Sequence, residues 1–302
     1  MRLSFTKMHA AGNDYIYVDG VERRLPELDW SAVSRDLSRR HHSVGSDGVI
    51  LILPSNEADF RMRLFNADGS EGDMCGNGVR CAASYIWERG FIGVDTFKME
   101  TGDGPVEVTV VPKDGGLSVS AKLRRPGFRL EEIPMLGEPE RDVEEEEGFN
   151  SSLEVLGRQI PVDGVRVGNP NCVIFVRDVE GIDLEHLGPL LEKHERFPAG
   201  TNVEFVQVID EETLRVRVWE RGSGITLACG TGAAAAAVCA VRRRRCTSPI
   251  GVEMPGGRLR VTWDGEENLV LSGPVERIYR GSVDLDQEHY APVGEDGEED
   301  MP

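Results

Sequence analysis

The stretch Met74-Cys75-Gly76-Asn77-Gly78 decides the fold, because it returns later in the chain as Ala228-Cys229-Gly230-Thr231-Gly232. The two cysteines stand 154 residues apart (229 − 75 = 154). Apolar and polar residues alternate in each hexapeptide that precedes them, RMRLFN at residues 61–66 and RVRVWE at residues 215–220. Such alternation predicts a strand. Each cysteine is therefore expected where a strand gives way, through glycines, to a helix.

Two further signatures repeat in the same order. Gly12-Asn13 returns as Gly168-Asn169, with the asparagines 156 residues apart (169 − 13 = 156). Gly45-Ser46-Asp47 returns as Gly200-Thr201-Asn202, at a separation of 155 (202 − 47 = 155). A fixed period over half the chain is the mark of an internal duplication. The sequence therefore predicts two similar halves.

Strands outnumber helices in each predicted half. The two glycine-rich motifs open helices over residues 76–88 and 230–243, and short alternating segments surround them, the last over residues 269–272. We predict an α+β fold of two pseudo-symmetric lobes, each a curved and mostly antiparallel sheet wrapped around a central helix. The lobe boundary is expected between residues 122 and 160, where prolines and an acidic run interrupt the pattern.

The charge balance excludes some classes of partner. The chain of 302 residues has a formal net charge of −19, whereas nucleic acids and anionic membranes attract a basic face. Residues 138–147 and the tail from residue 294 carry much of the acidic charge and are predicted to be solvated segments. We expect a small-molecule substrate, with neither nucleic acid nor membrane as partner. A homodimer is an assembly that the sequence leaves open.

Motifs for a metal, a cofactor or secretion are not found in the sequence. The six cysteines form no Cys-x-x-Cys pair and no Cys/His cluster, so a structural zinc site is not expected. No dinucleotide fingerprint, phosphate loop or lysine-centred pyridoxal motif appears, and we predict no cofactor. The first residues lack an apolar secretion segment, and a cytoplasmic location is expected.

A cysteine at a helix start is suited to proton chemistry. The free N–H groups and the aligned dipoles of a helix N-terminus favour an anion such as a substrate carboxylate. The same field favours thiolate, so we expect the pKa of Cys75 and of Cys229 to be lowered toward neutrality. Two such thiols, facing one cleft from two lobes, could act as base and acid on opposite faces of one carbon.

The motifs resemble those of the diaminopimelate epimerase family over about residues 1–283. The resemblance implies an isomerase, independent of pyridoxal phosphate (PLP), that interconverts LL- and meso-diaminopimelate in the cytoplasm for lysine and peptidoglycan synthesis. It also implies an N-terminal lobe of residues 1–125, to which residues 276–302 return, and a C-terminal lobe of residues 126–275. The resemblance is carried by Gly12-Asn13-Asp14, residues 65–70 (FNADGS), residues 74–80 (MCGNGVR), Gly168-Asn169-Pro170, residues 200–203 (GTNV), residues 220–224 (ERGSG) and residues 228–232 (ACGTG).

The resemblance assigns roles to matched residues. Cys75 and Cys229 would be the acid/base pair. The α-amino and α-carboxylate groups would be held by Asn13, Gly76, Asn77, Gly230 and Thr231. The distal amino-acid end would be held by Asn66, Asn169, Asn202 and Arg221. Glu220 would orient the site or bind the distal ammonium, although simple packing between the lobes is an alternative.

This chain departs from the family pattern at three positions. Asn171 stands where many members have a histidine close to one thiol, and asparagine cannot take up a proton. Ile225 replaces a glutamate, and Gly48 replaces a glutamine of some members. The alternatives are a racemase or epimerase of the same fold for another amino acid, a dithiol redox switch, and a catalytically inactive pair of lobes.

Overall fold

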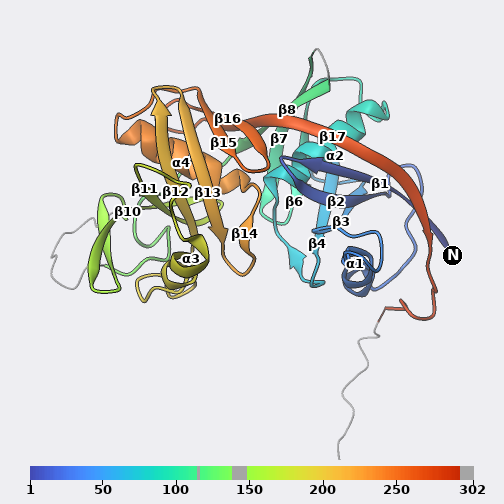
Figure 1. The fold of residues 1–302 in the computed structure, drawn as a ribbon. Coiled ribbons are helices and arrows are strands. Elements are labelled where there is room, and N and C mark those ends of the chain that lie inside the picture. The colour runs from blue at the N-terminus through green and yellow to red at the C-terminus, as the bar shows by residue number, and fades with distance from the viewer. Residues whose placement is uncertain (114–115, 138–147, 293–302) are drawn as a thin grey trace, which may run out of the picture.

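The computed structural model describes residues 1–113, 116–137 and 148–292, and forms two lobes that lie side by side (Figure 1). We call the part built from β1–β8 the N-lobe and the part built from β9–β16 the C-lobe. The N-lobe contains β1 (Arg2–Ala10), β2 (Asn13–Asp19), α1 (Trp30–Ser38), β3 (Gly48–Leu53), β4 (Phe60–Asn66), β5 (Glu71–Gly72), α2 (Gly76–Glu88), β6 (Thr96–Thr101), β7 (Gly104–Lys113) and β8 (Gly116–Leu123). The C-lobe and the last strand contain β9 (Ser151–Val155), β10 (Arg158–Val167), β11 (Asn169–Phe175), α3 (Leu184–Glu192), β12 (Asn202–Asp210), β13 (Thr213–Glu220), β14 (Gly224–Thr226), α4 (Gly230–Arg242), β15 (Ile250–Met254), β16 (Gly257–Trp263) and β17 (Leu269–Asp284).

The two lobes repeat one pattern of strand pairing. In the N-lobe β2 runs parallel to β3 and β4 parallel to β6, and in the C-lobe β11 and β12, and β13 and β15, pair in the same way. The other strand pairings are antiparallel, such as β3 with β4 and β12 with β13. The predicted fold class, two pseudo-symmetric lobes of mostly antiparallel sheet, is confirmed.

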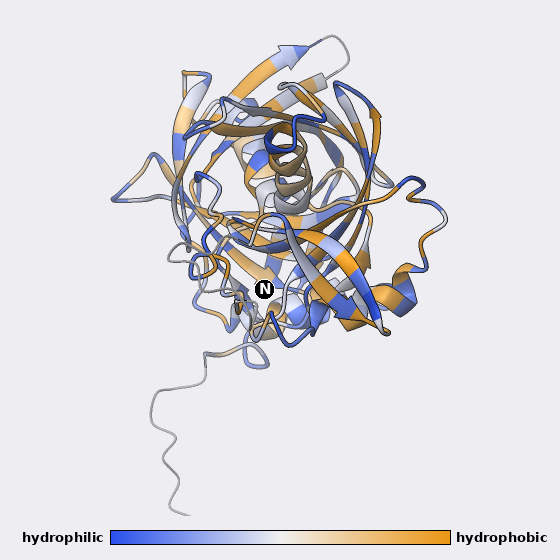
Figure 2. Ribbon diagram, turned by 90° about the vertical axis from the view of Figure 1, so that its left-hand side faces the viewer, coloured by the Kyte–Doolittle hydropathy of each residue, from blue (hydrophilic) through white to orange (hydrophobic). Residues whose placement is uncertain are grey.

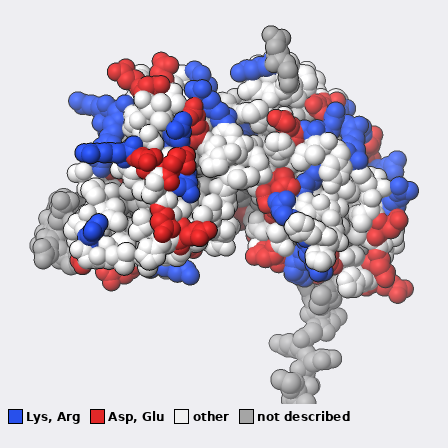
Figure 3. Space-filling model, in the orientation of Figure 1, with Lys and Arg blue, Asp and Glu red and all other residues white. Residues whose placement is uncertain are grey.

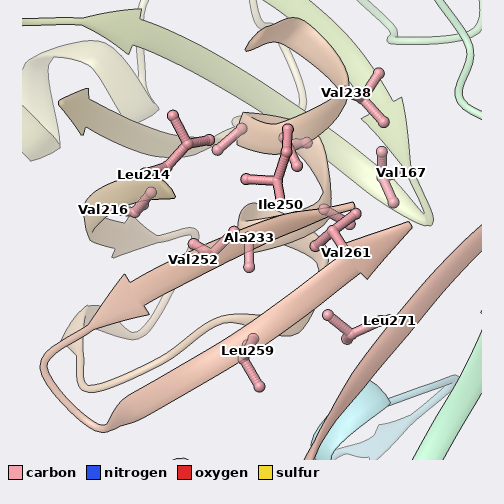
Figure 4. Close-up of a cluster of buried hydrophobic side chains, with 14 of the residues drawn as sticks. Val167, Leu214, Val216, Ala233, Val238, Ile250, Val252, Leu259, Val261 and Leu271 are labelled. Carbon is pink, nitrogen blue, oxygen red and sulfur yellow. The ribbon is translucent and has the colours of Figure 1, made fainter. Parts of the chain in front are cut away.

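A buried helix stands at the centre of each lobe, α2 in the N-lobe and α4 in the C-lobe. Figure 2 views the molecule from the C-lobe side and shows a helix enclosed by strands. Residues 233–237 of α4 are five consecutive buried alanines, whose small side chains let the surrounding strands pack closely. Figure 4 shows the aliphatic side chains around this helix, among them Val216, Ile250, Val252 and Val261. Burial of these side chains holds the start of α4 in place.

Strand β17 joins the lobes and runs across both in Figure 1. Its residues 269–275 pair with β8, residues 269–272 also pair with β16, and residues 276–284 pair with β1. The strand end predicted at residue 272 is wrong, because pairing across the lobes carries the strand through Gly273-Pro274. The lobe boundaries at residues 125/126 and 275/276 stay predictions.

Charged groups of both signs are mixed over the surface. In Figure 3 an indentation separates the lobes, and both acidic and basic side chains lie on its sides. The acidic run 138–147 and the tail 294–302 lie outside the described residues. Within residues 1–113, 116–137 and 148–292, none of the helices has the length and apolar character needed to cross a bilayer. In the same part of the chain, no group of three or more His, Cys, Asp or Glu side chains is arranged to hold a metal ion.

The turn between β15 and β16 in the C-lobe touches the β1–β2 turn of the N-lobe. A Cβ atom at Gly256 would overlap the carbonyl oxygen of Ala11 and meet the Leu227 side chain at 3.0 Å. We expect Gly256→Ala to lower the free energy of unfolding in urea by about 1–3 kcal/mol, the usual cost of overpacking. Gly93→Ala is the control, since a Cβ there meets nothing within 4 Å. Equal unfolding midpoints for the two variants would contradict a tight contact between the lobes.

Candidate active site

One cavity of about 800 Å³ lies between the lobes and receives residues from both. Cys75 and Cys229 both line it, each as the N-cap residue of its central helix. The other predicted site residues that line it are Asn13, Asn66, Gly76, Asn77, Asn169, Glu220, Arg221, Gly230 and Thr231. Asn202 is the one predicted site residue that does not line the cavity.

The Cys75 thiol is held by polar groups of the N-lobe. The extended backbone of Cys75, with φ −135° and ψ 114°, turns its sulfur back over the first turn of α2. Its Sγ accepts from the Gly78 N–H at 3.4 Å and donates to Asn13 Oδ1 at 3.4 Å. The buried hydroxyl of Tyr15 also hydrogen-bonds to this thiol. Tyr15 lines the cavity but was not predicted, because no motif marked it.

A charged network fixes the Asn13 amide. Asn13 Nδ2 donates to Asp47 Oδ2 at 2.8 Å, which leaves Oδ1 as the end that faces Cys75. Arg40 bridges Asp47 at 2.9 Å and Asp14 at 2.6 Å, and buried Lys7 pairs with Asp14 at 2.5 Å. Asp47 was not predicted as a site residue. Its place in the repeated motif Gly45-Ser46-Asp47 was the sequence signal that could have identified it.

The Cys229 thiol has acidic neighbours instead. Cys229 has the same extended backbone, with φ −119° and ψ 118°, and its sulfur lies 3.4 Å from Thr231 Oγ1. The Glu220 carboxyl accepts from Thr226 Oγ1 at 2.5 Å and interacts electrostatically with the thiol. A second carboxyl, that of Glu204, is fully buried nearby, and in its ionised form it would raise the pKa of Cys229 further.

Glu204 occupies a position that is aliphatic in the other lobe. Its Oε1 would lie 2.7 Å from a Cβ at Gly232, just as the Cδ1 atom of Ile50 would lie 2.7 Å from a Cβ at Gly78. Among the described residues, neither oxygen of Glu204 has a hydrogen-bonding partner. Burial, followed by the nearby charge of Glu220, holds the pKa of Glu204 well above its ordinary value of 4.5. Glu204 was missed because its sequence surroundings are those of a buried strand.

The expected lowering of the thiol pKa values is wrong for this structure. Burial raises the pKa of Cys75, and the hydrogen bonds from Gly78 and Tyr15 only partly offset it. Burial, and then the charge of Glu220, raise the pKa of Cys229 well above its ordinary value. Both thiols are therefore protonated at neutral pH, since desolvation outweighs the field of the helix starts.

Three further predicted residues, Arg221, Asn66 and Asn169, line the cavity. The Arg221 Nη1 donates to the Ala199 carbonyl at 3.1 Å, and its side chain lies against Gly200. Asn66 Nδ2 donates to Ser70 Oγ at 3.0 Å, and Asn169 lines the cavity from the C-lobe. This set combines one cation with polar amides, a composition that can bind a carboxylate.

Asn202 and Asn171 lie behind Arg221 and Asn169, to which they are hydrogen-bonded. Asn202 Oδ1 accepts from the Arg221 backbone N–H at 2.9 Å, and its Nδ2 donates to Asn171 Oδ1 at 3.4 Å. Asn171 Nδ2 donates in turn to the Asn169 carbonyl at 2.7 Å. Asn171 is fully buried and contributes no surface to the cavity. The two asparagines therefore position Arg221 and Asn169, and direct binding of substrate by Asn202 stays a prediction.

Solved structures of low sequence identity share the fold. The Bacillus anthracis phenazine biosynthesis protein of the PhzF family matches with a TM-score of 0.69 at 17% identity, covering 94% of this chain and 100% of that one. A hydroxyproline epimerase from Agrobacterium vitis matches with a TM-score of 0.68 at 16% identity, covering 95% of this chain and 92% of that one. The chain thus belongs to the class of two-lobed proteins that have this fold.

Comparison by sequence points to one family within this fold. A family model described as diaminopimelate epimerase matches residues 5–121 and 164–278. A diaminopimelate epimerase of Halothermothrix orenii is 44% identical over 286 residues, 94% of this chain and 98% of its own length. One of Bacillus pumilus is 43% identical over 284 residues, 93% and 98% of the two chains. The chain belongs to the diaminopimelate epimerase family, so the resemblance read from its motifs and the enzyme class, an isomerase, are confirmed.

The buried Glu204 predicts a pH-dependent loss of stability. Because its folded-state pKa is raised, the carboxyl stays protonated in the fold but ionises in the unfolded chain above about pH 4.5. Unfolding then releases a proton, and stability falls with rising pH by up to about 1.4 kcal/mol per unit. We expect Glu204→Gln to remove this slope, so that its advantage over the wild type grows between about pH 5 and pH 8 in urea unfolding.

Glu195→Gln is the control for that measurement, because Glu195 is exposed. It is expected to follow the wild type at every pH. A difference between Glu204→Gln and the wild type that does not change with pH would contradict a protonated Glu204 in the fold.

Proposed function

We propose that this chain interconverts LL- and meso-diaminopimelate, with Cys75 and Cys229 transferring protons on opposite faces of the α-carbon. The observation that carries the proposal is that both thiols, each at the start of a central helix, line one cavity to which both lobes contribute. Membership in the family supplies the substrate, because the relatives at 43–44% identity are named diaminopimelate epimerases.

In the proposed reaction one thiolate removes the α-hydrogen as a proton, and the opposite thiol delivers its own proton to the other face. One sulfur gains the proton that the other loses, so the pair is inverted after each turnover. Between the two transfers the electron pair of the broken C–H bond is delocalised into the α-carboxylate. Backbone N–H groups at the starts of α2 and α4 would stabilise that charge, since both helix starts lie at the cavity.

One thiol must lose its proton before the reaction can begin. Glu220 supports this step on the side of Cys229, because its carboxyl interacts with that thiol, lines the same cavity and has a pKa that burial raises. A carboxyl with a raised pKa is a better proton acceptor at neutral pH than an ordinary one. We therefore propose that Glu220 accepts the Cys229 proton when substrate enters.

Three other residues that line the cavity, Arg221, Asn66 and Asn169, favour a substrate with a second amino-acid group. The planar guanidinium of Arg221 suits a distal carboxylate, and the amides of Asn66 and Asn169 can accept from a distal ammonium. The proposal requires no PLP, since both proton transfers are assigned to thiols. A cytoplasmic location, a place in lysine and peptidoglycan synthesis and a homodimer remain part of the proposal and rest on the sequence alone.

The experiment is α-hydrogen exchange in deuterated water. We expect the wild type to place deuterium at one α-carbon of LL-diaminopimelate. Cys75→Ser and Cys229→Ser are each expected to lower epimerisation by at least about 100-fold, because a hydroxyl is a far weaker proton donor and acceptor pair at neutral pH. Cys246→Ser is the matched control, since that cysteine lies outside the cavity and its thiol donates to the Asp210 carbonyl.

The same assay on other amino acids tests the substrate. Exchange on proline or hydroxyproline, with none on diaminopimelate, would replace the proposal with a racemase of the same fold. Full activity in either active-site cysteine variant would remove the two-thiol mechanism.

A further inference from the structure

Arg80 is a buried cation without an acidic partner. It lies in the second turn of α2, with 0% of its surface exposed. Its Nη1 donates to the Gly76 carbonyl at 3.2 Å and its Nη2 to Asn77 Oδ1 at 2.7 Å, while Nε has no hydrogen-bonding partner in residues 1–113, 116–137 and 148–292. Within the part of the chain that the structure describes, no carboxylate forms an ion pair with Arg80.

The guanidinium lies where the two central helices begin. A Cβ at Gly230, the first residue of α4, would lie 3.9 Å from Arg80 Nη1 and 3.8 Å from Asn77 Oδ1. The side chain therefore extends from α2 to the start of α4. The repeat gives the matching position in α4 to Ala234 (234 − 80 = 154), so only one lobe supplies this charge.

A guanidinium in such a place stays charged, because arginine is not deprotonated in proteins. Burying an uncompensated charge is costly, and two neutral oxygens compensate it only in part. An anion in the adjoining cavity would complete the compensation. The starts of both helices add partial positive charge in the same place, and this also favours an anion.

We propose that Arg80 is a positioning residue for the α-carboxylate of the substrate, acting through Asn77 and through its fixed charge between the two helix starts. The inference rests on the proposed function. Arg80 holds the oxygen of the Asn77 amide, which leaves the amide N–H groups as the end available to the cavity. Its charge opposes that which develops on the carboxylate when the α-hydrogen leaves.

The charge of Arg80 also acts on Cys75. Other ionisable groups that act on Cys75 are Tyr15 and Tyr17 of β2, Cys81 of α2 and Glu220 of β13. Glu220 has the opposite effect to a cation. Removal of Arg80 is therefore expected to raise the pKa of Cys75, because a nearby cation favours thiolate. The pKa of Cys229 is raised instead mainly by burial and then by the charge of Glu220.

The first test compares Arg80→Lys, which keeps a charge, with Arg80→Met, which keeps an apolar stem. We expect Arg80→Met to lower kcat/KM for α-hydrogen exchange on diaminopimelate by at least about 100-fold, and Arg80→Lys by about 10-fold. Guanidinium chloride added to Arg80→Ala is expected to restore activity, whereas urea, which is neutral and of similar shape, is not. Equal activity of the Lys and Met variants, or equal rescue by urea, would overturn the proposal.

The second test needs no turnover. Iodoacetamide alkylation is followed against pH, and peptide mass spectrometry resolves Cys75 from Cys229. We expect Arg80→Met to move the midpoint for Cys75 to higher pH and to leave that for Cys229 nearly unchanged. A shift of both thiols together, or of neither, would overturn the proposal and assign Arg80 to packing alone.

The outcomes separate the two proposals. A wild type that exchanges no α-hydrogen removes the proposed function, and the alkylation profile then decides whether Arg80 acts on Cys75. If Arg80→Met and Arg80→Ala fail to fold by circular dichroism, Arg80→Lys carries the test. It is expected to raise KM more than it lowers kcat, because lysine lacks the fork that holds both Gly76 and Asn77, and an unchanged KM would overturn the proposal.

Discussion

The structure depends on bringing two helix N-termini of like partial charge to one cavity between the lobes. Each start exposes unpaired N–H groups, and two such ends repel one another unless the surrounding packing holds them. That packing is the paired sheet. Strand β17 is hydrogen-bonded to β8, β16 and β1, so it fastens both lobes along one continuous strand. The arrangement stores a strong preference for an anion between the helices, and the function proposed here uses that preference.

Much of this arrangement could be predicted from the sequence, because local patterns determine it. The start of α2 at Gly76 and its end at Glu88 follow from a strand, a glycine-rich turn and an apolar helix read in order. The second half of β17 could not be predicted, because its pairing with β1 joins residues about 280 positions apart across Gly273-Pro274. Strand β10 was not predicted for a different reason, because its Pro161 and Gly164 interrupt the alternation of apolar and polar residues.

The thiol pKa values show a different limit. Sequence position fixes the dipole of a helix start, but not how deeply a sulfur is buried or which carboxyls lie near it. Here burial outweighs the dipole at both cysteines. The alignment of Gly45-Ser46-Asp47 with Gly200-Thr201-Asn202 was also only partly correct. The sequence aligned Asn202 with Asp47, whereas the strand register, with Val49 opposite Phe65 and Val203 opposite Trp219, aligns Asn202 with Gly48.

The duplication gives the two thiols the same backbone but different electrostatic surroundings. Near Cys75 the N-lobe supplies the cation Arg80, and the matching residue in the C-lobe is Ala234. Near Cys229 the C-lobe supplies Glu204, where the N-lobe has Ile50. An epimerase must run in both directions, yet a proton shared between unequal sites does not reside on both equally. The asymmetry therefore favours a resting state in which Cys75 is the thiol more readily ionised, whereas Cys229 keeps its proton until Glu220 accepts it. On this argument, the residues that differ between the two lobes determine which thiol ionises first. They thereby determine which face of the substrate is deprotonated first.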